Sequence, residues 1–360
     1  TTEIYTLSLH DALPIWYHES MIPAVLPRRR FLNGLAALGA SAVLPGCQSV
    51  APERTAPSRI DVHHHLAPPG FIKEIVARKT GQRPLAEWTA GKSIEAMDRA
   101  GIATSLVSIS EPGVWYGDNA AARALARECN EFGARMARDY PGRFGQFASL
   151  PIPDVDASLR EIEFALDVLK ADGICLLTSY SGKYLGDPSF APVMEELNRR
   201  KAVVFTHPVR ADCCRNLVPG VGENVIELAT DTSRTITSLL VSGTTVRYPD
   251  VRFVFSHAGG TLPALTGRIV QLYGANKNFA QRVPGGPLPE LKKCYYDTAN
   301  SGTAPTMAAL MALVPTSQIL FGTDYPWVPA GATVRDLGAN AFPAEVMAAI
   351  ERENALRLLP

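Results

Sequence analysis

Seven histidines are present in the sequence, and the positions of five of them are its clearest indication of chemistry. Each of the five ends a short segment rich in apolar, β-branched and aromatic residues, which is the pattern of a β-strand. The five are His63, His64, His65, His207 and His257. Successive side chains of a strand point to opposite faces, so His63 and His65 are expected to share one face while His64 points to the other. Two imidazoles at this spacing can hold a metal ion from two sides.

Two further donors are expected to complete a metal site. His207 supplies a third nitrogen, and Asp324 supplies an oxygen just after the last β-rich segment. Three imidazoles and one carboxylate are a usual ligand set for a divalent cation, with a position left for water or substrate. We therefore predict one divalent metal ion bound by His63, His65, His207 and Asp324. Zn²⁺ is the first expectation and Mn²⁺ the alternative, because these ligand types do not distinguish the two metals.

His257 is expected beside this metal site, as a base, because four ligands already fill the set. A single histidine at a strand end is more often a hydrogen-bonded core residue than a ligand, and that is the expectation for His64. Asp324 has an alternative role as the cap of a helix or turn.

Alternating strands and helices must bring these residues together. Eight β-rich segments occur at residues 59–65, 102–110, 144–150, 173–179, 202–207, 251–257, 294–299 and 318–323. Apolar residues at three- and four-residue spacing predict helices at 120–140, 157–171, 188–200, 225–247 and 344–358. This alternation predicts an α/β fold, a (β/α)8 TIM barrel of the metal-dependent hydrolase type, whose active site lies at the C-terminal ends of the strands. The alternative, a doubly wound open sheet, lacks its usual GxGxxG after the first strand.

The balance of charge excludes one class of partner. The 360 residues include 35 Lys+Arg and 35 Asp+Glu, so a nucleic-acid partner is not expected. The six cysteines contain no CxxC pair and predict neither a disulfide framework nor a sulfur-ligated zinc site. The adjacent Cys213 and Cys214 are expected to pack independently, because neighbouring side chains on an extended segment point apart, with a redox pair as the alternative.

Residues 1–47 are predicted to be a leader that does not belong to the fold. Residues 1–20 show no periodicity and resemble translated adaptor sequence. Residues 21–47 contain three consecutive arginines, an apolar run too short to span a bilayer, and a final Leu-Pro-Gly-Cys. This pattern resembles a twin-arginine export signal with a lipidated Cys47. We expect a periplasmic protein or a membrane-anchored lipoprotein, whose only membrane contact is the lipid anchor, with a linker at 48–58; a helix that stays attached is the alternative.

Four motifs resemble the amidohydrolase superfamily, and more narrowly its aminocarboxymuconate-semialdehyde decarboxylase-like branch, over residues 59–360. They are His63-His64-His65, His207-Pro208, Ser256-His257-Ala258-Gly259-Gly260 and Gly322-Thr323-Asp324-Tyr325-Pro326. In that branch the matching histidines and aspartate bind one divalent metal, and the histidine after strand six orients or activates water at the metal. Binuclear members carry a bridging lysine on strand four, but residues 172–179 contain none. The resemblance therefore implies a mononuclear centre.

Within that branch, residues 173–208 and 212–220 look most like 6-methylsalicylate decarboxylase and its near relatives. The resemblance implies a non-oxidative decarboxylase of a hydroxybenzoate-type aromatic acid, with His257 and Asp324 as the catalytic residues. Asp324, or water controlled by both residues, is expected to supply the proton that the ring needs before CO2 leaves. The alternatives are a metal-dependent hydrolase of a lactone, ester or amide, which uses the same ligands, and an exported lipoprotein that binds metal or aromatic acids without catalysis.

The same family implies a homodimer that acts on a small aromatic carboxylic acid. Related enzymes hold the substrate carboxylate with an arginine across the dimer interface, and Arg268 matches its place after the strand-six histidine, with a structural ion pair as the alternative. Trp115, Tyr325 and Trp327 follow the second and eighth predicted strands, so they are expected to line an aromatic pocket.

Overall fold

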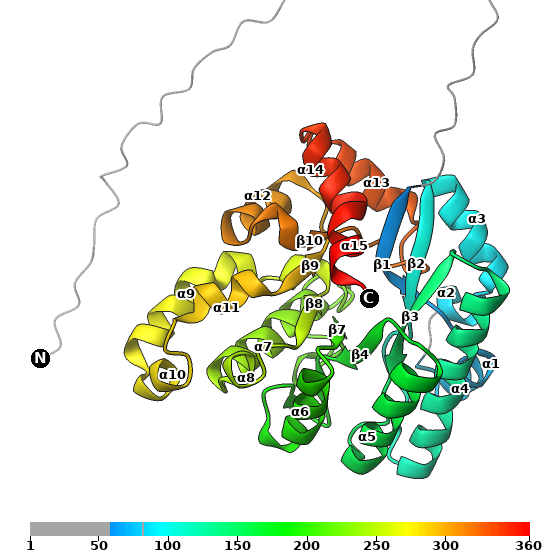
Figure 1. Ribbon diagram of the computed structural model, residues 1–360, viewed down its shortest axis with the longest axis horizontal. Helices are drawn as coiled ribbons and strands as arrows, with labels where there is room; N and C mark the ends of the chain where they lie inside the picture. Colours follow the sequence, from blue (N-terminus) through cyan, green and yellow to red (C-terminus); the bar gives the residue numbers. More distant parts are fainter. Residues whose placement is uncertain (1–57, 81–82) are drawn as a thin grey trace, which may run out of the picture. The chain divides into compact units, whose positions relative to one another are not determined.

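Eight parallel strands organise the part of the chain that the computed structural model describes, residues 58–80 and 83–360 (Figure 1). In barrel order the strands are β1 (Arg59–His65), β2 (Ile102–Ser108), β3 (Phe144–Ser149), β4 (Gly173–Leu177), β7 (Val203–His207), β8 (Arg252–Phe255), β9 (Tyr295–Asp297) and β10 (Ile319–Leu320). The chain after β10 returns to β1 and almost closes the barrel, since the amide of Val62 donates to the carbonyl of Phe321 at 2.9 Å and the amide of His65 to that of Tyr325 at 2.7 Å. The predicted TIM barrel is confirmed, whereas the predicted leader and all but the last residue of the predicted linker lie outside the described residues.

Helices cover the outside of this barrel (Figure 1). They are α1 (Pro69–Ala77), α2 (Arg83–Ala86), α3 (Ala90–Ala100), α4 (Asn119–Asp139), α5 (Val155–Glu163), α6 (Ala191–Arg199), α7 (Glu227–Val241), α8 (Thr244–Arg247), α9 (Leu262–Ala275), α10 (Lys277–Arg282), α11 (Pro287–Lys293), α12 (Ala304–Leu313), α13 (Gly331–Gly338), α14 (Ala344–Ala348) and α15 (Asn354–Leu358). A small hairpin, β5 (Ser179–Tyr180) and β6 (Lys183–Tyr184), follows β4. The single helix predicted at 225–247 is two helices, because Gly243 adopts a left-handed φ of 73° between them. Within 58–80 and 83–360, none of the helices combines the length and the apolar character needed to cross a bilayer.

The barrel interior is filled by apolar side chains from the barrel strands, and Tyr295 of β9 packs partly buried against them. These side chains are Ile60, Val62, Leu106, Phe147, Cys175, Val203, Phe205, Val254 and Leu320. Only an interior position lets residues from strands on opposite sides of a barrel contact one another. Leu358 of α15 joins the same cluster, and Arg252, the first residue of β8, donates a hydrogen bond to the Leu358 carbonyl at 2.6 Å. Helix α15 therefore closes the N-terminal end of the barrel, and the opposite end remains for a site.

A register shift in β1 decides how its histidines are aimed. The pairing of β1 with β2 shifts between Asp61 and His64. Val62 belongs to the interior cluster, and the ring of the next residue, His63, contacts the interior Phe205 with centroids 4.9 Å apart. Two consecutive residues therefore face inward, which is the effect of a β-bulge. His64 points away from the interior and hydrogen bonds Asp61 (Nδ1 to Oδ2, 3.0 Å), as expected for a core histidine.

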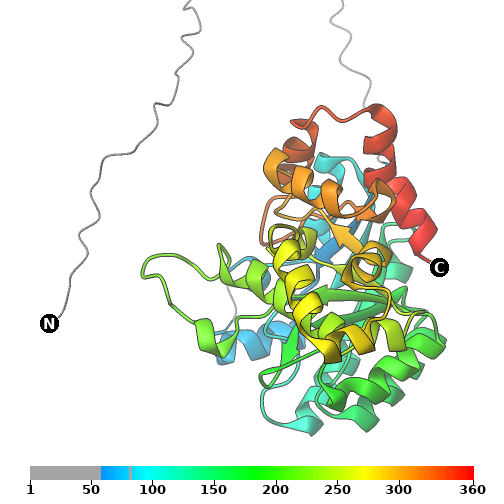
Figure 2. The same ribbon diagram turned by 90° about the vertical axis from the view of Figure 1, so that its left-hand side faces the viewer.

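Cys213 and Cys214 are joined by a disulfide in the 3₁₀ turn Asp212–Cys214. The prediction that they pack independently is wrong, because this segment is a turn and not an extended strand, so neighbouring side chains can meet. The turn lies in the long segment between β7 and α7, which extends from the barrel as the yellow-green segment of Figure 2.

The turn after β8 has an unusual backbone. Four consecutive residues have positive φ, namely His257 (56°), Ala258 (56°), Gly259 (75°) and Gly260 (66°). A residue with a side chain is strained in this region, and such strain is often found at functional sites. The turn therefore singles out His257, the predicted catalytic histidine.

Replacement of Gly260 by alanine is expected to lower the free energy of unfolding by about 2–5 kcal/mol. The added Cβ would lie 1.8 Å from the carbonyl oxygen of Ala229 in α7, and the positive φ of Gly260 disfavours alanine as well. Urea unfolding followed by circular dichroism measures the change. Gly267→Ala is the matched control, because that Cβ would meet no atom within 4 Å and alanine favours a helix. Equal stability of Gly260→Ala and the wild type would contradict the expectation.

Candidate active site

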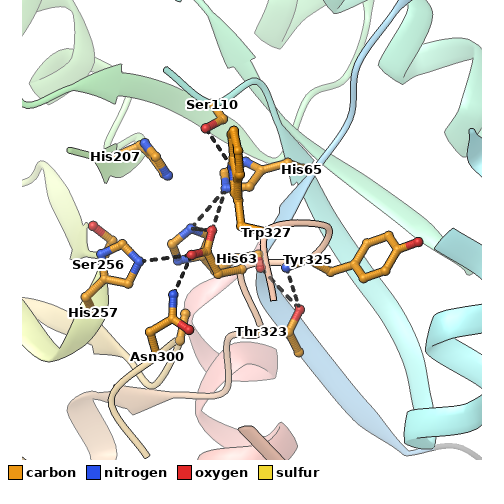
Figure 3. Close-up of polar contacts among 12 residues, drawn as sticks. His63, His65, Ser110, His207, Ser256, His257, Asn300, Thr323, Tyr325 and Trp327 are labelled. Carbon is orange, nitrogen blue, oxygen red and sulfur yellow. Dashed lines mark hydrogen bonds and ion pairs between the residues drawn. The ribbon is translucent and has the colours of Figure 1, made fainter. Parts of the chain in front are cut away.

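The four predicted metal ligands meet at the C-terminal ends of β1 and β7 and in the turn after β10. His63, His65, His207 and Asp324 each offer one donor atom, and these atoms lie within 4.8 Å of one another in a fully buried cluster. The Nε2 atoms of His63 and His65 are 3.2 Å apart (Figure 3). Oδ1 of Asp324 lies 3.2 Å from the first of these nitrogens and 3.0 Å from the second. Residues from three distant segments thus form one donor cluster.

The other ring nitrogens decide which atoms the histidines turn toward this cluster. Nδ1 of His63 lies 2.8 Å from Oδ2 of Asp297, Nδ1 of His65 lies 3.2 Å from the Ser108 carbonyl, and Nδ1 of His207 lies 2.9 Å from the Pro208 carbonyl. A carbonyl only accepts hydrogen bonds, so Nδ1 of His65 and of His207 carries the proton and Nε2 keeps its lone pair. Lone pairs that converge on a buried carboxylate repel one another unless a cation lies among them. The donor set therefore fits one divalent metal ion.

Before a cation binds, a proton on His63 relieves this repulsion. Burial opposes the charged form of His63, but Asp297 and Asp324 outweigh burial and raise the pKa of His63 to about 10. Burial lowers the pKa of His65, and it holds the pKa of His207 well below the usual range. A cation that binds here must therefore displace the proton of His63.

The two carboxylate oxygens of Asp324 contact different groups. Oδ1 faces the ligand histidines, whereas Oδ2 accepts a hydrogen bond from Nδ2 of Asn300 at 2.6 Å and lies 3.4 Å from Nε2 of His257 (Figure 3). Burial opposes its charge, but His63 and the hydrogen bonds from His257, His63 and His65 hold the pKa of Asp324 well below the usual range. An ionised carboxylate suits a metal ligand and does not suit a proton donor at neutral pH. The ionised state of Asp324 therefore suits its predicted role as a metal ligand better than its predicted role as an acid.

His257 lies beside the donor cluster. Its ring centroid is 5.0 Å from that of His63 and 6.1 Å from that of His207. Its backbone amide donates to Oδ1 of Asp297 at 2.9 Å, so one carboxylate holds both this turn and the ring of His63. His257 lines the cavity and is not one of the four donors, so its imidazole can face a bound molecule instead of the metal.

Strand β4 offers no second set of metal ligands. Its inward side chain is Cys175, and burial raises the pKa of this thiol to about 12, so it stays protonated and is a poor ligand. The arrangement matches the mononuclear centre expected from the lack of a lysine in this strand.

The donor cluster opens into a cavity of about 400 Å³, a volume within the range of small-molecule sites. The cavity is lined by Ser110, Glu111, His207, Arg210, Asn224, Val225, Leu228, Ala229, His257, Asn300, Ser301, Asp324, Trp327 and Val328. Polar groups from the ends of several strands and apolar groups around the start of α7 thus face one space, which can hold a small molecule with polar and apolar parts.

The two aromatic residues predicted after the last strand point in different directions. Trp327 lines the cavity, and its Nε1 donates to Oγ of Ser110 at 3.0 Å. Tyr325 does not line it, because its ring stacks on His64 with centroids 4.9 Å apart and turns away from the ligand histidines (Figure 3). The predicted pocket role of Trp327 therefore fits the structure, and that of Tyr325 does not.

Trp115 and Arg268 also lie outside the lining of the cavity. Nε1 of Trp115 donates to Oδ1 of Asn119 at 3.0 Å near the surface. Arg268 is exposed on α9. A contact between Arg268 and a substrate would require a second chain, so its role across a dimer interface stays a prediction.

Four residues of the site were not expected from the sequence: Asp297, Asn300, Glu111 and Arg210. Asp297 is the last residue of β9, and Asn300 follows three residues later. Glu111 follows the end of β2, and Arg210 follows the end of β7. All four lie at or just after the C-terminal end of a barrel strand, as the five histidines do. The same criterion, applied to carboxylates, amides and arginines, would have found them.

Replacement of Asp297 by asparagine is expected to weaken metal binding about 10- to 100-fold. The carboxylate orients His63 through the 2.8 Å contact, and its negative charge raises the basicity of the imidazole. A neutral amide cannot raise the basicity in this way. Competition with a chromophoric chelator measures the affinity. Asp250→Asn, at an exposed position, is the control and should bind metal like the wild type. Unchanged affinity in Asp297→Asn would show that the contact does not support the ligand.

Comparison with known proteins agrees with the geometry. A protein of Aspergillus niger named as a decarboxylase is 38% identical over 325 residues, which cover 84% of this chain and 87% of the relative. A 6-methylsalicylic acid decarboxylase of Aspergillus aculeatus is 36% identical over 318 residues, which cover 84% of this chain and 96% of the relative. The crystal structure of an amidohydrolase II has a TM-score of 0.77 and 28% identity, over 84% of this chain and 99% of that one.

A dihydroxybenzoic acid decarboxylase of Polaromonas, solved with bound manganese, has a TM-score of 0.73 and 20% identity over 84% of this chain and 96% of its own, a likeness of fold alone. The family described as Amidohydrolase matches residues 60–360, which include the whole barrel but for its first residue, Arg59. The chain therefore belongs to the amidohydrolase family.

Proposed function

We propose that this protein is a divalent-metal-dependent decarboxylase that removes CO2 from a hydroxybenzoate-type aromatic acid without oxidation, with a 6-methylsalicylate-like acid as the first candidate. The observation that carries the proposal is the cavity of about 400 Å³ that His207, Asp324 and His257 line together. The relatives named as decarboxylases, which match most of the chain, favour this reaction over hydrolysis.

The order of events follows from the substrate. Direct loss of CO2 would leave an electron pair in the plane of the ring, where the aromatic system cannot delocalise it. The ring carbon that carries the carboxylate must therefore take a proton first, and the carbon–carbon bond then breaks, so that its electron pair restores the aromatic ring. When bound, the metal would orient and polarise the carboxylate and the neighbouring phenolic oxygen.

His257 is the group that supplies this proton. It lines the cavity, and its Nε2 lies 3.4 Å from Oδ2 of the ionised Asp324, which holds the imidazole in position. Asn300 holds the same oxygen with its amide and fixes the carboxylate. Trp327, pinned by Ser110, provides an aromatic wall for the ring of the substrate.

The identity of the metal, the oligomer and the location of the protein belong to the same proposal. The donor set suits Zn²⁺, and manganese in the Polaromonas decarboxylase supports Mn²⁺. A homodimer would place Arg268 of α9 at an interface. Export through residues 21–47 and lipidation of Cys47 rest on the sequence motif. Metal analysis of the purified protein, its mass in solution, and fractionation of cells that produce the full chain test the three parts.

Turnover of a panel of hydroxybenzoates by the metal-loaded protein tests the reaction. We expect CO2 and the corresponding phenol in equal amounts. A coupled enzyme assay for bicarbonate measures the CO2, and chromatography measures the phenol. Hydrolysis of lactones, esters or amides without any CO2 from the hydroxybenzoates would replace the proposal by the hydrolase alternative.

A further inference from the structure

Arg210 is the only arginine or lysine among the described residues that line the cavity. It follows ligand His207 by three residues, at the end of the same strand. Its guanidinium is therefore presented to the same space as the donor cluster and His257. None of the roles assigned above to the ligands, to the proton donor or to the aromatic wall uses it.

Glu111 holds this arginine in place. Oε1 of Glu111 lies 2.7 Å from Nη1 of Arg210, and Oε2 accepts a hydrogen bond from the backbone amide of Arg210 at 3.0 Å. Both carboxylate oxygens are thus occupied by one residue, and Glu111 is only 7% exposed. This contact joins the ends of β2 and β7, which are not neighbours in the barrel. The Glu111 carboxylate thus links the Arg210 guanidinium to the backbone of the same residue and restricts where this side chain can lie.

The guanidinium is held but not saturated. Its Nε is buried and forms an ion pair with Oε2 of Glu223 at 3.6 Å without a hydrogen bond, whereas Nη2 donates no hydrogen bond to any of the described residues. A guanidinium nitrogen without a protein acceptor can donate to a ligand that enters the cavity, and charge-assisted hydrogen bonds of this kind are among the stronger ones. The ligand class that matches a planar, charged, multiple donor is a carboxylate.

We propose that Arg210, positioned by Glu111, binds the carboxylate of the aromatic acid and makes the site select acids over neutral phenols. The inference rests on the proposed function, since it names the group that recognises its substrate. Arg210 belongs to the chain that carries the cavity, so recognition does not need Arg268, which is exposed on α9. Loss of CO2 removes the acceptor, so the phenol product is held less tightly than the substrate and can leave.

Binding of two unreactive probes to the metal-loaded full-length protein tests the inference by calorimetry. The probes are 2-methylbenzoate, which has the carboxylate but no hydroxyl, and 3-methylphenol, which has no carboxylate. Arg210→Gln is expected to weaken binding of 2-methylbenzoate about 10- to 100-fold, the range of a charge-assisted contact, and to leave 3-methylphenol unchanged. Arg210→Lys keeps the positive charge but loses the planar guanidinium, so its affinity for 2-methylbenzoate should lie between that of Arg210→Gln and that of the wild type. In turnover, KM should rise by a similar factor while kcat changes less.

Three variants make the result interpretable. Arg215→Gln removes an exposed arginine of the same segment, paired with Asp212 at 2.8 Å, and should behave like the wild type. The double variant Glu111→Gln/Arg210→Gln avoids an unpaired buried carboxylate and should show the same selective loss if Arg210→Gln alone does not fold. Glu111→Gln alone should weaken binding of 2-methylbenzoate in the same direction but less, because it disturbs only the orientation of Arg210.

The outcomes separate this inference from the proposed reaction. CO2 release by the wild type together with unchanged binding and KM in the Arg210 variants would overturn the inference and leave the reaction standing. Binding of 2-methylbenzoate that depends on Arg210, without CO2 release from any hydroxybenzoate, would overturn the reaction and support the anion site. Failure of the wild type to bind 2-methylbenzoate at all would overturn the inference.

Discussion

His257→Asn is expected to reduce kcat by about 10²- to 10⁴-fold, the usual contribution of a positioned acid or base, while the protein keeps its metal. His257 lines the cavity but lies outside the four-residue donor cluster, so its loss removes a proton carrier and no ligand. Asparagine tolerates the positive φ of 56° at this position better than most residues, so the turn after β8 is preserved. Turnover of a hydroxybenzoate and metal analysis of the same preparation measure the two effects.

Two control measurements separate loss of the proton donor from loss of binding or of metal. Binding of 2-methylbenzoate to His257→Asn should match that of the wild type, because the imidazole acts on the ring carbon and not on the carboxylate. His207→Ala should by contrast lose both metal and turnover, because His207 is one of the four donors. Retention of kcat within a few-fold in His257→Asn would assign the proton to another group, and loss of metal would make His257 a ligand.

Affinity for the divalent cation is expected to rise about tenfold for each unit of pH between about pH 6 and pH 9. The pKa of His63 is raised to about 10 in the protein before a cation binds, so His63 is protonated throughout this range. The cation needs the neutral ring and displaces one proton, so higher pH favours binding, and the increase should level off as the pH passes the pKa. The lowered pKa values of His65 and His207 mean that these two rings release no further proton there.

Competition with a metal chelator of known pH dependence measures this slope, and a pH indicator in weak buffer counts the released protons. Asp297→Asn provides an internal check. Since Asp297 is a main cause of the raised pKa of His63, its loss should make the slope flatten at a lower pH. An affinity that does not depend on pH, with no proton released, would show that His63 is already neutral before the cation binds.

The spacing of a few residues along the chain was sufficient to predict the metal site. His63 and His65 were placed on one face by the two-residue period of a strand, and His207 and Asp324 were added because they end other predicted strands of the same barrel. These inferences succeed because the C-terminal ends of parallel barrel strands meet at one face whatever the loops do. The four donor atoms do lie within 4.8 Å of one another.

The direction of side chains in the turns was not open to the same reasoning. Tyr325 and Trp327 are two residues apart, yet Tyr325 stacks outward on His64 and Trp327 lines the cavity. The amide of Trp327 donates to the Asp324 carbonyl at 2.9 Å, so residues 324–327 form a turn, where the alternation of faces that holds within a strand does not apply. Cys213 and Cys214 were misjudged for a related reason, because a turn replaced the expected extended backbone.

Local periodicity and the order of the strands are enough to predict the barrel and the donor set. The groups that complete the site depend instead on contacts between segments that are far apart in the sequence. Asp297 reaches His63 across 234 residues of sequence, and Glu111 reaches Arg210 across 99. Such contacts depend on a β-bulge, on left-handed turns and on the closure of the barrel, and none of these is written in the spacing of residue types.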